Sequence, residues 1–287
     1  MSASGPGWTP SPRELERRDV RRQRSRRDLL VATVAAVVVI GGLLAGLLLS
    51  PGWPTVRSGF LSWHDAKASF PAVIKGFLKY NVTGFLIAEP FILLIGVLVA
   101  VTRGTTSATM FPLRVIAVVY TDVFRGLPTY LVVIVFGLAI PGLGLQGVTT
   151  NTFWLGLTAL VLCYGAYVAE VFRAGIESIH PSQVASADTL GLSRGQAMRH
   201  VVLPQATRRV MPPLLNDFIS LQKDTALLGG IFVFEGLFAA QDYGAYNFNY
   251  TPITVVGVLF LCLTVPLTRF TDWIGRRAMR RQFAGVR

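Results

Sequence analysis

Long apolar runs constrain this chain more than any other feature of its sequence. A helix needs about twenty mostly apolar residues to cross a hydrocarbon core of about 30 Å. Six runs approach this length, at residues 29–49, 82–101, 115–140, 153–172, 210–234 and 252–270. Charged residues make up 15% of the chain, below the roughly 25% typical of soluble domains. The sequence therefore predicts an all-α integral membrane protein with about six transmembrane helices.

The first run, residues 29–49, has two interpretations. A secretory signal peptide has a basic segment, then a short apolar region of about 7 to 15 residues and a cleavage site with small residues. The run here is longer and carries no charge between Asp28 and Arg57. A retained anchor helix is therefore favoured over a signal peptide.

Basic residues are distributed unevenly along the chain, whose net charge is +12. If the amino terminus is cytoplasmic, most of them fall in cytoplasmic segments, before residue 29, within 173–209 and after residue 268. Cytoplasmic loops of multi-pass proteins carry such an excess. This predicts a multi-pass protein of the cell membrane, in contact with lipid and with both termini cytoplasmic. Because the basic residues flank spans and form no groove with interleaved aromatics, no nucleic-acid partner is predicted.

The expected organisation follows from these runs and charges. A basic cytoplasmic tail at residues 1–28, predicted to be disordered, precedes an anchor helix at residues 29–50. An external segment at residues 51–76 and a transmembrane core at residues 77–272 follow. A second basic cytoplasmic tail covers residues 273–287. The three histidines share no metal-ligand spacing, and both cysteines fall inside predicted spans, so neither a metal site nor a disulfide is predicted.

The polar stretch VASADTLGLSRGQAMRHVVLP, residues 184–204, separates the fourth and fifth apolar runs. Just before it, Pro181 suits the first position of a helix. Gly191 suits a left-handed helix C-cap, and Ser193 with Gln196 forms a capping box that restarts a helix. The sequence predicts a helix, a tight corner and a second helix.

The first of these helices carries a narrow apolar stripe made of Val184, Ala187 and Leu190. Such a short element cannot span the bilayer or bury its stripe alone. It is expected to dock either on the protein's own helix ends or in a groove of another subunit. Glu170 and Arg173, three residues apart, are predicted to form a structural pair where this cytoplasmic loop begins.

Ionisable residues inside the apolar runs are candidates for a substrate path. Asp122 and Arg125 share a helical face, so they either neutralise each other or reach out to the nearby interface. Lys223 and Asp224 are adjacent and point about 100° apart on a helix, which favours two different environments. The path candidates are Asp122, Arg125, Lys223, Asp224 and Thr225.

Four motifs of the chain resemble one family. Residues 185–204 are similar to the cytoplasmic-loop signature of ABC importer permease subunits, which is E-A-A, three residues, Gly, nine residues and Ile-x-Leu-Pro. Residues 185–187 occupy the triplet, Gly191 has the required spacing, and residues 201–204 close the motif. The stretches GAYVAEVFRAGIESIHPSQ, LPQATRRVMPPLLNDFISLQKDTAL and FRGLP resemble the polar amino acid branch, which carries histidine, glutamine, glutamate or arginine. The resemblance covers about residues 77–272.

The resemblance implies a five-helix permease core, preceded here by the anchor helix, with a cytoplasmic coupling helix between spans four and five. It also implies cytoplasmic ABC ATPase subunits, a second permease chain, the same or homologous, and an external solute-binding protein as partners. The implied ATPase-coupling residues are Ser182, Gln183, Ala185, Ser186, Ala187, Asp188, Leu190, Gly191, Leu192 and Ser193.

Two positions depart from the family pattern. Ala185 replaces the acidic residue that contributes a charged contact to the ATPase in the family, and Ser182 replaces the usual glycine. The departure at Ala185 leaves Asp188 or Glu177 as substitutes for the missing charge.

Sequence motifs also bear on catalysis. The chain contains no G-x-x-x-x-G-K-[ST] phosphate loop, so no cofactor is expected on it and ATP with Mg²⁺ is assigned to the partner ATPase. It is predicted to be a transport subunit. The alternatives are an ion-driven secondary amino acid transporter, which should show repeated halves, and, less favoured, an intramembrane enzyme, for which no nucleophile–base pair or HExxH motif is present.

Overall fold

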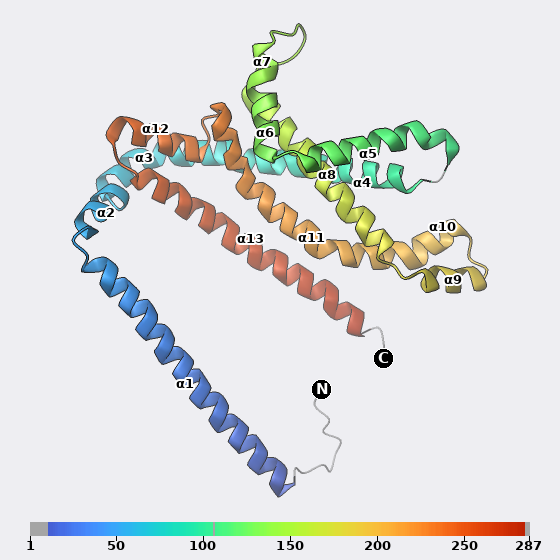
Figure 1. Cartoon of the computed structure of the whole chain (residues 1–287), viewed down its shortest axis with the longest axis horizontal. Coiled ribbons are helices and arrows are strands. Elements are labelled where there is room, and N and C mark those ends of the chain that lie inside the picture. The colour runs from blue at the N-terminus through green and yellow to red at the C-terminus, as the bar shows by residue number, and fades with distance from the viewer. Residues whose placement is uncertain (1–10, 106, 285–287) are drawn as a thin grey trace. The chain divides into compact units, whose positions relative to one another are not determined.

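The computed structural model describes residues 11–105 and 107–284 (Figure 1). All regular elements among these residues are helical, which confirms the predicted fold class. The chain divides into two compact units, Met1–Ser58 and Gly59–Arg287.

The first unit consists mainly of helix α1, Pro12–Leu48. Ser11 caps it, since the Ser11 side chain accepts a hydrogen bond from the backbone N–H of Glu14. The part Arg27–Leu48 is long and apolar enough to cross a membrane, as expected of an anchor helix. The prediction of a disordered tail is wrong from Pro12 onward, because no glycine or proline interrupts the helix before Gly41. The remainder of the predicted tail, residues 1–10, lies outside the described residues.

Helices of very different length follow α1. In chain order they are α2 (Trp53–Phe60), α3 (Trp63–Gly76), η1 (Phe77–Val82), α4 (Thr83–Gly104), η2 (Ala108–Met110), α5 (Phe111–Gly126), α6 (Thr129–Ile134), η3 (Val135–Ala139), α7 (Ile140–Gly142), α8 (Thr152–Glu177), α9 (Pro181–Thr189), α10 (Arg194–Ala197), η4 (Met198–Val202), α11 (Leu203–Asp224), η5 (Thr225–Ile231), α12 (Gly236–Asn247) and α13 (Thr251–Ala284).

The predicted count of six spans is not confirmed. Among the described residues, four helical stretches are long and apolar enough to cross a membrane, or up to five if one bent pair of helices counts as a span. They are Arg27–Leu48, Trp53–Gly104, Thr152–Glu177 and Thr251–Arg277, and the bent pair is Ala108–Gly126 with Thr129–Gly142.

The bent pair corrects the prediction of one straight span over residues 115–140. Helix α5 ends at Gly126, α6 begins at Thr129, and the chain turns by 104° between them. Leu127 is extended (φ −93°, ψ 142°), as expected for a residue that precedes proline. Pro128 also lacks the N–H that would continue the helix.

The apolar run over residues 210–234 does not form one spanning helix. Helix α11 begins earlier, at Leu203, and ends at Asp224, after which the backbone tightens into the 3₁₀ segment η5. Charged residues along α11 keep it from meeting the apolarity that a span requires. They are Arg208, Arg209, Asp217, Lys223 and Asp224.

The core of the second unit lies where α4, α8 and α11 pack together. Ile92, Leu160 and Leu221 are fully buried there. Small residues let these helices approach closely: a Cβ atom added to Gly175 of α8 would lie 2.1 Å from Cγ1 of Val210 of α11. A second cluster joins α3 to α12 and α13. Figure 1 shows α3 and α12 at one end of this unit, and α9 and α10 at the other.

Candidate functional site

The helix–corner–helix predicted in the polar loop is confirmed. Helix α9 starts at Pro181 and ends in a Schellman motif, the six-residue closure that commonly ends helices. Its two hydrogen bonds run from the N–H of Leu192 to the carbonyl of Ala187 (3.1 Å) and from the N–H of Gly191 to the carbonyl of Asp188 (3.0 Å). Gly191 has a φ of +77°, in the left-handed region that favours glycine.

The restart of the helix is also confirmed. The N–H of Ser193 donates to Oε1 of Gln196 (2.8 Å), and the N–H of Gln196 donates to Oγ of Ser193 (3.3 Å). This reciprocal pair satisfies two donors at the start of α10. The corner is therefore held by its own local hydrogen bonds.

The corner is fixed at its base and open at its tip. Gln205 of α11 bonds the side chain of Gln183, and Arg209 donates to the carbonyl of Ser178. Ala187 is buried, whereas Leu190 is 79% exposed. Of the ten predicted coupling residues, only Ala187 is buried and Leu192 half-buried; the others are exposed. The apolar stripe thus packs partly on the chain itself and leaves a free surface at the tip.

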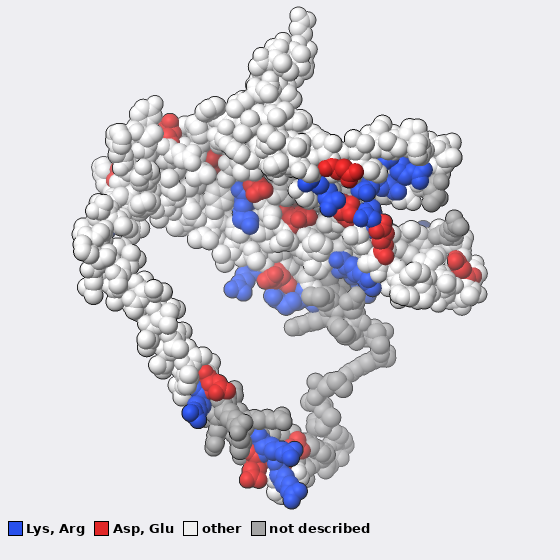
Figure 2. All heavy atoms as spheres, in the orientation of Figure 1, with Lys and Arg blue, Asp and Glu red and all other residues white. Residues whose placement is uncertain are grey.

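A cluster of charges joins the helices that lead into this corner. Glu170 of α8 pairs with three arginines, Arg103 of α4 (3.1 Å), Arg125 of α5 (3.4 Å) and Arg173 of its own helix. Arg103 also donates to the hydroxyl of Thr121 (3.0 Å). The side chains of Arg103 and Glu170 are only 16% and 18% exposed. Figure 2 shows these charges gathered in the region of α4, α5 and α8.

The predicted pair of Glu170 and Arg173 is confirmed, but the interpretation of Asp122 and Arg125 as a mutual pair is not. Arg125 pairs with Glu170, and Asp122 is exposed with no ion pair among the described residues. The convergence of Arg103 on Glu170 joins residues 67 positions apart. No local pattern in the sequence signals such a contact.

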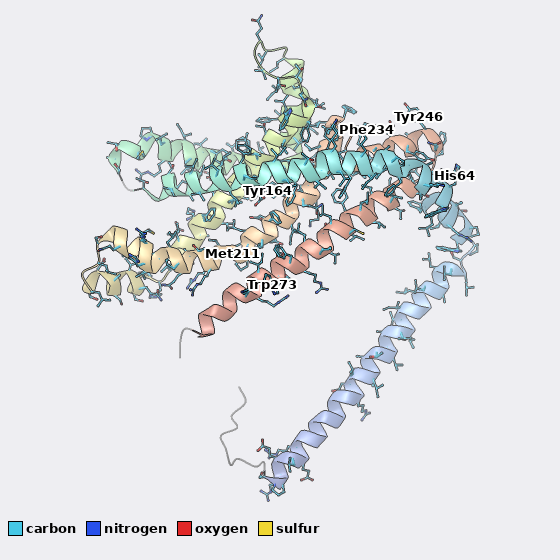
Figure 3. The ribbon with its side chains drawn as sticks, turned by 180° about the vertical axis from the view of Figure 1, so that it is seen from behind. His64, Tyr164, Met211, Phe234, Tyr246 and Trp273 are labelled. Atoms are coloured by element: carbon cyan, nitrogen blue, oxygen red, sulfur yellow. The ribbon has the colours of Figure 1, made fainter. Side chains whose placement is uncertain are left out.

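A second polar group lies deeper in the bundle, where α11 ends. The hydroxyl of Tyr164 on α8 donates to Oδ2 of Asp224 (2.8 Å), and Figure 3 labels Tyr164 in the middle of the second unit. Thr225 is buried and accepts a hydrogen bond from Nδ2 of Asn81 (3.2 Å). Lys223 is exposed and forms no ion pair within the described part of the chain. As predicted, Lys223 and Asp224 have different environments.

Three further polar residues lie near this point. Gln222 is 1% exposed; its Oε1 accepts from Thr264 of α13 (2.7 Å), while its Nε2 has no partner among the described residues. The carboxylate of Glu235 caps α12 by accepting from the N–H groups of Leu237 and Phe238. Asn81 lies in η1, a π-helical segment, and such segments are frequent at functional sites. Its position beside Thr225 depends on tertiary packing, which the sequence does not reveal.

The predicted path residues therefore lie at two levels of α8. Asp224 and Thr225 lie beside Tyr164, whereas Arg125 lies beside Glu170. Tyr164 and Glu170 are six residues apart, so the two levels differ by about 9 Å along the helix axis. The structure does not bring all five candidates into one site.

Comparison with known proteins identifies the family. A sequence model of the family described as "Binding-protein-dependent transport system inner membrane component" matches residues 92–280. The chain belongs to this family. It is accordingly a membrane transport component, a permease subunit of an ABC transporter, and ATP hydrolysis belongs to other chains.

Two curated relatives of this permease come from Bacillus subtilis. A probable glutamine ABC transporter permease protein is 32% identical over 192 residues, which cover 67% of this chain and 85% of that protein. An arginine transport system permease protein is 32% identical over 190 residues, covering 66% of this chain and 84% of that protein. The family match supports the permease hypothesis over an ion-driven secondary transporter.

Solved structures show the same fold. A crystal structure of an amino acid ABC transporter with histidines matches with a TM-score of 0.67 at 24% identity, covering 75% of this chain and 98% of that chain. The MetNI methionine ABC transporter in an inward-facing conformation matches with a TM-score of 0.56 at 20% identity, covering 73% of this chain and 97% of that chain. The permease thus has the helical fold of these transporters.

The positive φ of Gly191 predicts the effect of the substitution Gly191→Val. A Cβ atom at Gly191 would meet no atom within 4 Å, so the cost comes from the positive φ alone, about 1–2 kcal/mol. We expect normal insertion into the membrane, measured by membrane abundance, but reduced transport. Gly195→Val is the matched control, because Gly195 also faces open space and has no positive φ. Equal transport by the two variants would contradict the geometry described for the corner.

The charge cluster predicts that two glutamates of α8 contribute unequally to the unfolding free energy. Glu170→Gln leaves Arg103 and Arg125 without their carboxylate, and we expect a loss of about 1–3 kcal/mol in unfolding free energy. Glu177 pairs with Arg173 alone within the described residues and is 61% exposed. The substitution Glu177→Gln should therefore cost less than about 1 kcal/mol. Thermal unfolding of the detergent-solubilised protein checks both. A larger effect at Glu177 would refute the assignment of Glu170 as the centre of the cluster.

Proposed function

We propose that this chain forms the substrate path of an ATP-driven ABC importer for polar amino acids and couples that path to a separate ATPase. The observation that carries the proposal is the exposed α9–α10 corner, which bears the family signature at residues 185–204. The names of the relatives, a glutamine and an arginine permease, support an amino acid as the substrate. The protein is placed in the cell membrane with both termini cytoplasmic, because that orientation leaves most basic residues inside.

The tip of the corner is proposed to enter a groove of the ATPase. Leu190 supplies the apolar contact, since it is 79% exposed at the turn. Asp188 is the better substitute for the charge missing at Ala185. It is exposed and forms no ion pair among the described residues, whereas Glu177 is engaged by Arg173.

Substrate is proposed to pass the junction of α11 and η5. An amino acid carries both charges at its backbone, so its path needs groups of both signs and free backbone dipoles. The junction offers the exposed ammonium of Lys223 and the half-buried carboxylate of Asp224. The α-helix also tightens into 3₁₀ backbone there, at Thr225, and the helical backbone ends at Ile231. Non-helical backbone inside a bundle is tolerated where it is buried in protein or lines a cavity. Asp122 and Arg125 are proposed to flank the cytoplasmic end of this path.

Two further partners complete the proposal. A second permease chain, identical or homologous, pairs with this one, and an external solute-binding protein delivers the amino acid. ATP and Mg²⁺ bind to the ATPase subunits, and this chain holds no cofactor. Residues 77–272 are proposed as the permease core and residues 29–50 as the added anchor.

Co-purification and uptake energetics test the proposal together. A tagged chain, extracted under conditions that preserve membrane complexes, should bring down an ABC ATPase. Uptake of a polar amino acid should stop when the phosphate-loop lysine of that ATPase is replaced, and should persist when the proton gradient is collapsed. Uptake that survives ATPase inactivation but fails without the gradient would instead establish the ion-driven alternative. Competition with a panel of amino acids in the same assay identifies the substrate.

The path proposal predicts a loss of uptake in Asp224→Asn. Removing the carboxylate charge should cost about 1.5–3 kcal/mol of interaction with a bound ammonium group, which corresponds to about tenfold or more in transport. Tyr164→Phe is the control, since it removes only the hydrogen bond to Asp224 and leaves the charge. We expect Tyr164→Phe to keep most of the uptake at equal membrane abundance. If Asp224→Asn transports at the normal rate, Asp224 does not contact substrate.

A further inference from the structure

A groove of about 770 Å³ lies between α3 and the start of α13, and neither the substrate path nor the coupling corner uses it. It lies at the end of the unit opposite α9 and α10, as Figure 1 shows for the helices that form it. Both walls belong to stretches apolar enough to cross a membrane, Trp53–Gly104 and Thr251–Arg277. Because Thr251–Arg277 is long and apolar enough to cross a membrane, a groove at the start of α13 lies near one end of that candidate span.

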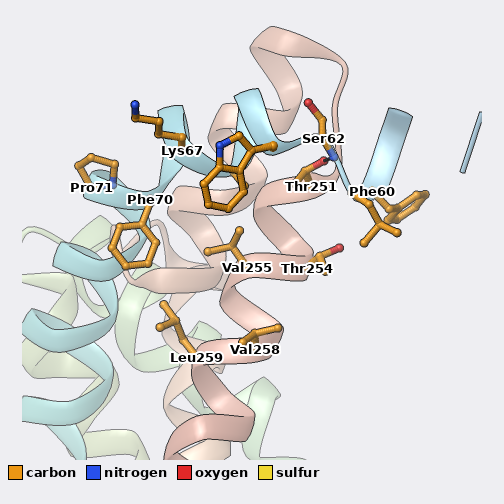
Figure 4. Close-up of a pocket in the computed structure, with 13 residues that line it drawn as sticks. Phe60, Ser62, Lys67, Phe70, Pro71, Thr251, Thr254, Val255, Val258 and Leu259 are labelled. Carbon is orange, nitrogen blue, oxygen red and sulfur yellow. Dashed lines mark hydrogen bonds between the residues drawn. The ribbon is translucent and has the colours of Figure 1, made fainter. Parts of the chain in front are cut away.

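The walls of the groove are apolar and follow helical spacing on both sides. Helix α13 contributes Val255, Val258 and Leu259, which lie on successive turns away from Thr251. Helix α3 contributes Trp63 and Phe70, and Figure 4 shows the ring of Phe70 on the side of α3 that faces Val255 and Leu259 of α13. Phe70 is 46% exposed and Val258 is 51% exposed. An elongated apolar molecule would cover these side chains.

One charge stands at the edge of this apolar surface. Lys67 is the single ionisable residue among the lining side chains, and Figure 4 shows its amine pointing away from Val258 and Leu259. It forms no ion pair among the described residues. The nearby acid, Asp65, instead accepts hydrogen bonds from Ser62 and from the hydroxyl of Tyr243 on α12 (2.9 Å). The positive charge of Lys67 is thus left for a ligand.

We propose that this groove binds an anionic phospholipid. Its phosphate would pair with Lys67, and one acyl chain would run along Phe70 and Val258 toward Leu259. A zwitterionic headgroup fits less well, because its ammonium group would be repelled by the same lysine. Trp63, 80% exposed at the groove, has the amphipathic ring that favours the headgroup level of a bilayer.

Quenching of Trp63 fluorescence by lipids with brominated chains tests this proposal. The full chain, with its other tryptophans replaced by Phe, is reconstituted into phosphatidylcholine vesicles in which either brominated phosphatidylglycerol or brominated phosphatidylcholine is a minor component. One lysine near a membrane surface is worth about 1 kcal/mol toward an anionic lipid, so phosphatidylglycerol should bind about fivefold more tightly. Lys67→Gln should abolish this preference. Lys75→Gln should keep it, since Lys75 lies on the same helix but does not line the groove.

Four results would overturn the proposal. Equal quenching by the two lipids would show ordinary lipid contact only. A preference that survives Lys67→Gln would place the anion elsewhere, and a preference lost equally in Lys75→Gln would reflect general surface charge. Absence of quenching by either lipid would show that protein fills the groove. None of these measurements requires transport, so they are independent of the proposed importer activity.

Discussion

The absence of water from the bilayer interior is the constraint on which this structure depends. Every buried N–H and carbonyl must find a partner within the chain, which leaves helices as the available form. Where the helix is interrupted inside the bundle, between α11 and α12, side chains replace the lost backbone partners. The N–H of Gly236 donates to Asn81, and the N–H groups at the start of α12 donate to Glu235. At this interruption, polar side chains therefore satisfy the backbone groups that the helix no longer pairs.

The same constraint explains why the polar loop leaves the bundle and how it remains attached. Helix α8 is continuous over Thr152–Glu177 and leads directly into α9. Along its length, α8 carries the hydrogen bond to Asp224 and then the arginine contacts of Glu170. A displacement of the α9–α10 corner would therefore act on a helix that touches the proposed substrate path. This continuity is the physical basis of the proposed coupling.

Local chemistry was predictable from the sequence, and long-range contacts were not. The corner at Gly191 and the capping box at Ser193 depend on hydrogen bonds within a few residues, so the local pattern identified both. A proline such as Pro128 ends or kinks a helix, but the sequence does not give the change of direction of 104° that follows, because the angle depends on packing. The run over residues 210–234 appeared to be one spanning helix when judged by its apolar residues, but its α-helix begins at Leu203 and ends at Asp224. The partners of Glu170 come from three helices, and no spacing rule connects them.

The proposed coupling requires the ATPase to bind the tip of the α9–α10 corner. Site-specific photocross-linking can detect this contact, with a photoreactive amino acid at Leu190 and, in a separate sample, at Tyr246 of α12. Both side chains are highly exposed, at 79% and 80%, but they lie at opposite ends of the unit. We expect a covalent adduct between position 190 and the ATPase and none from position 246. An adduct from position 246 alone, or no adduct from position 190 in an intact complex, would show that the ATPase does not bind this tip.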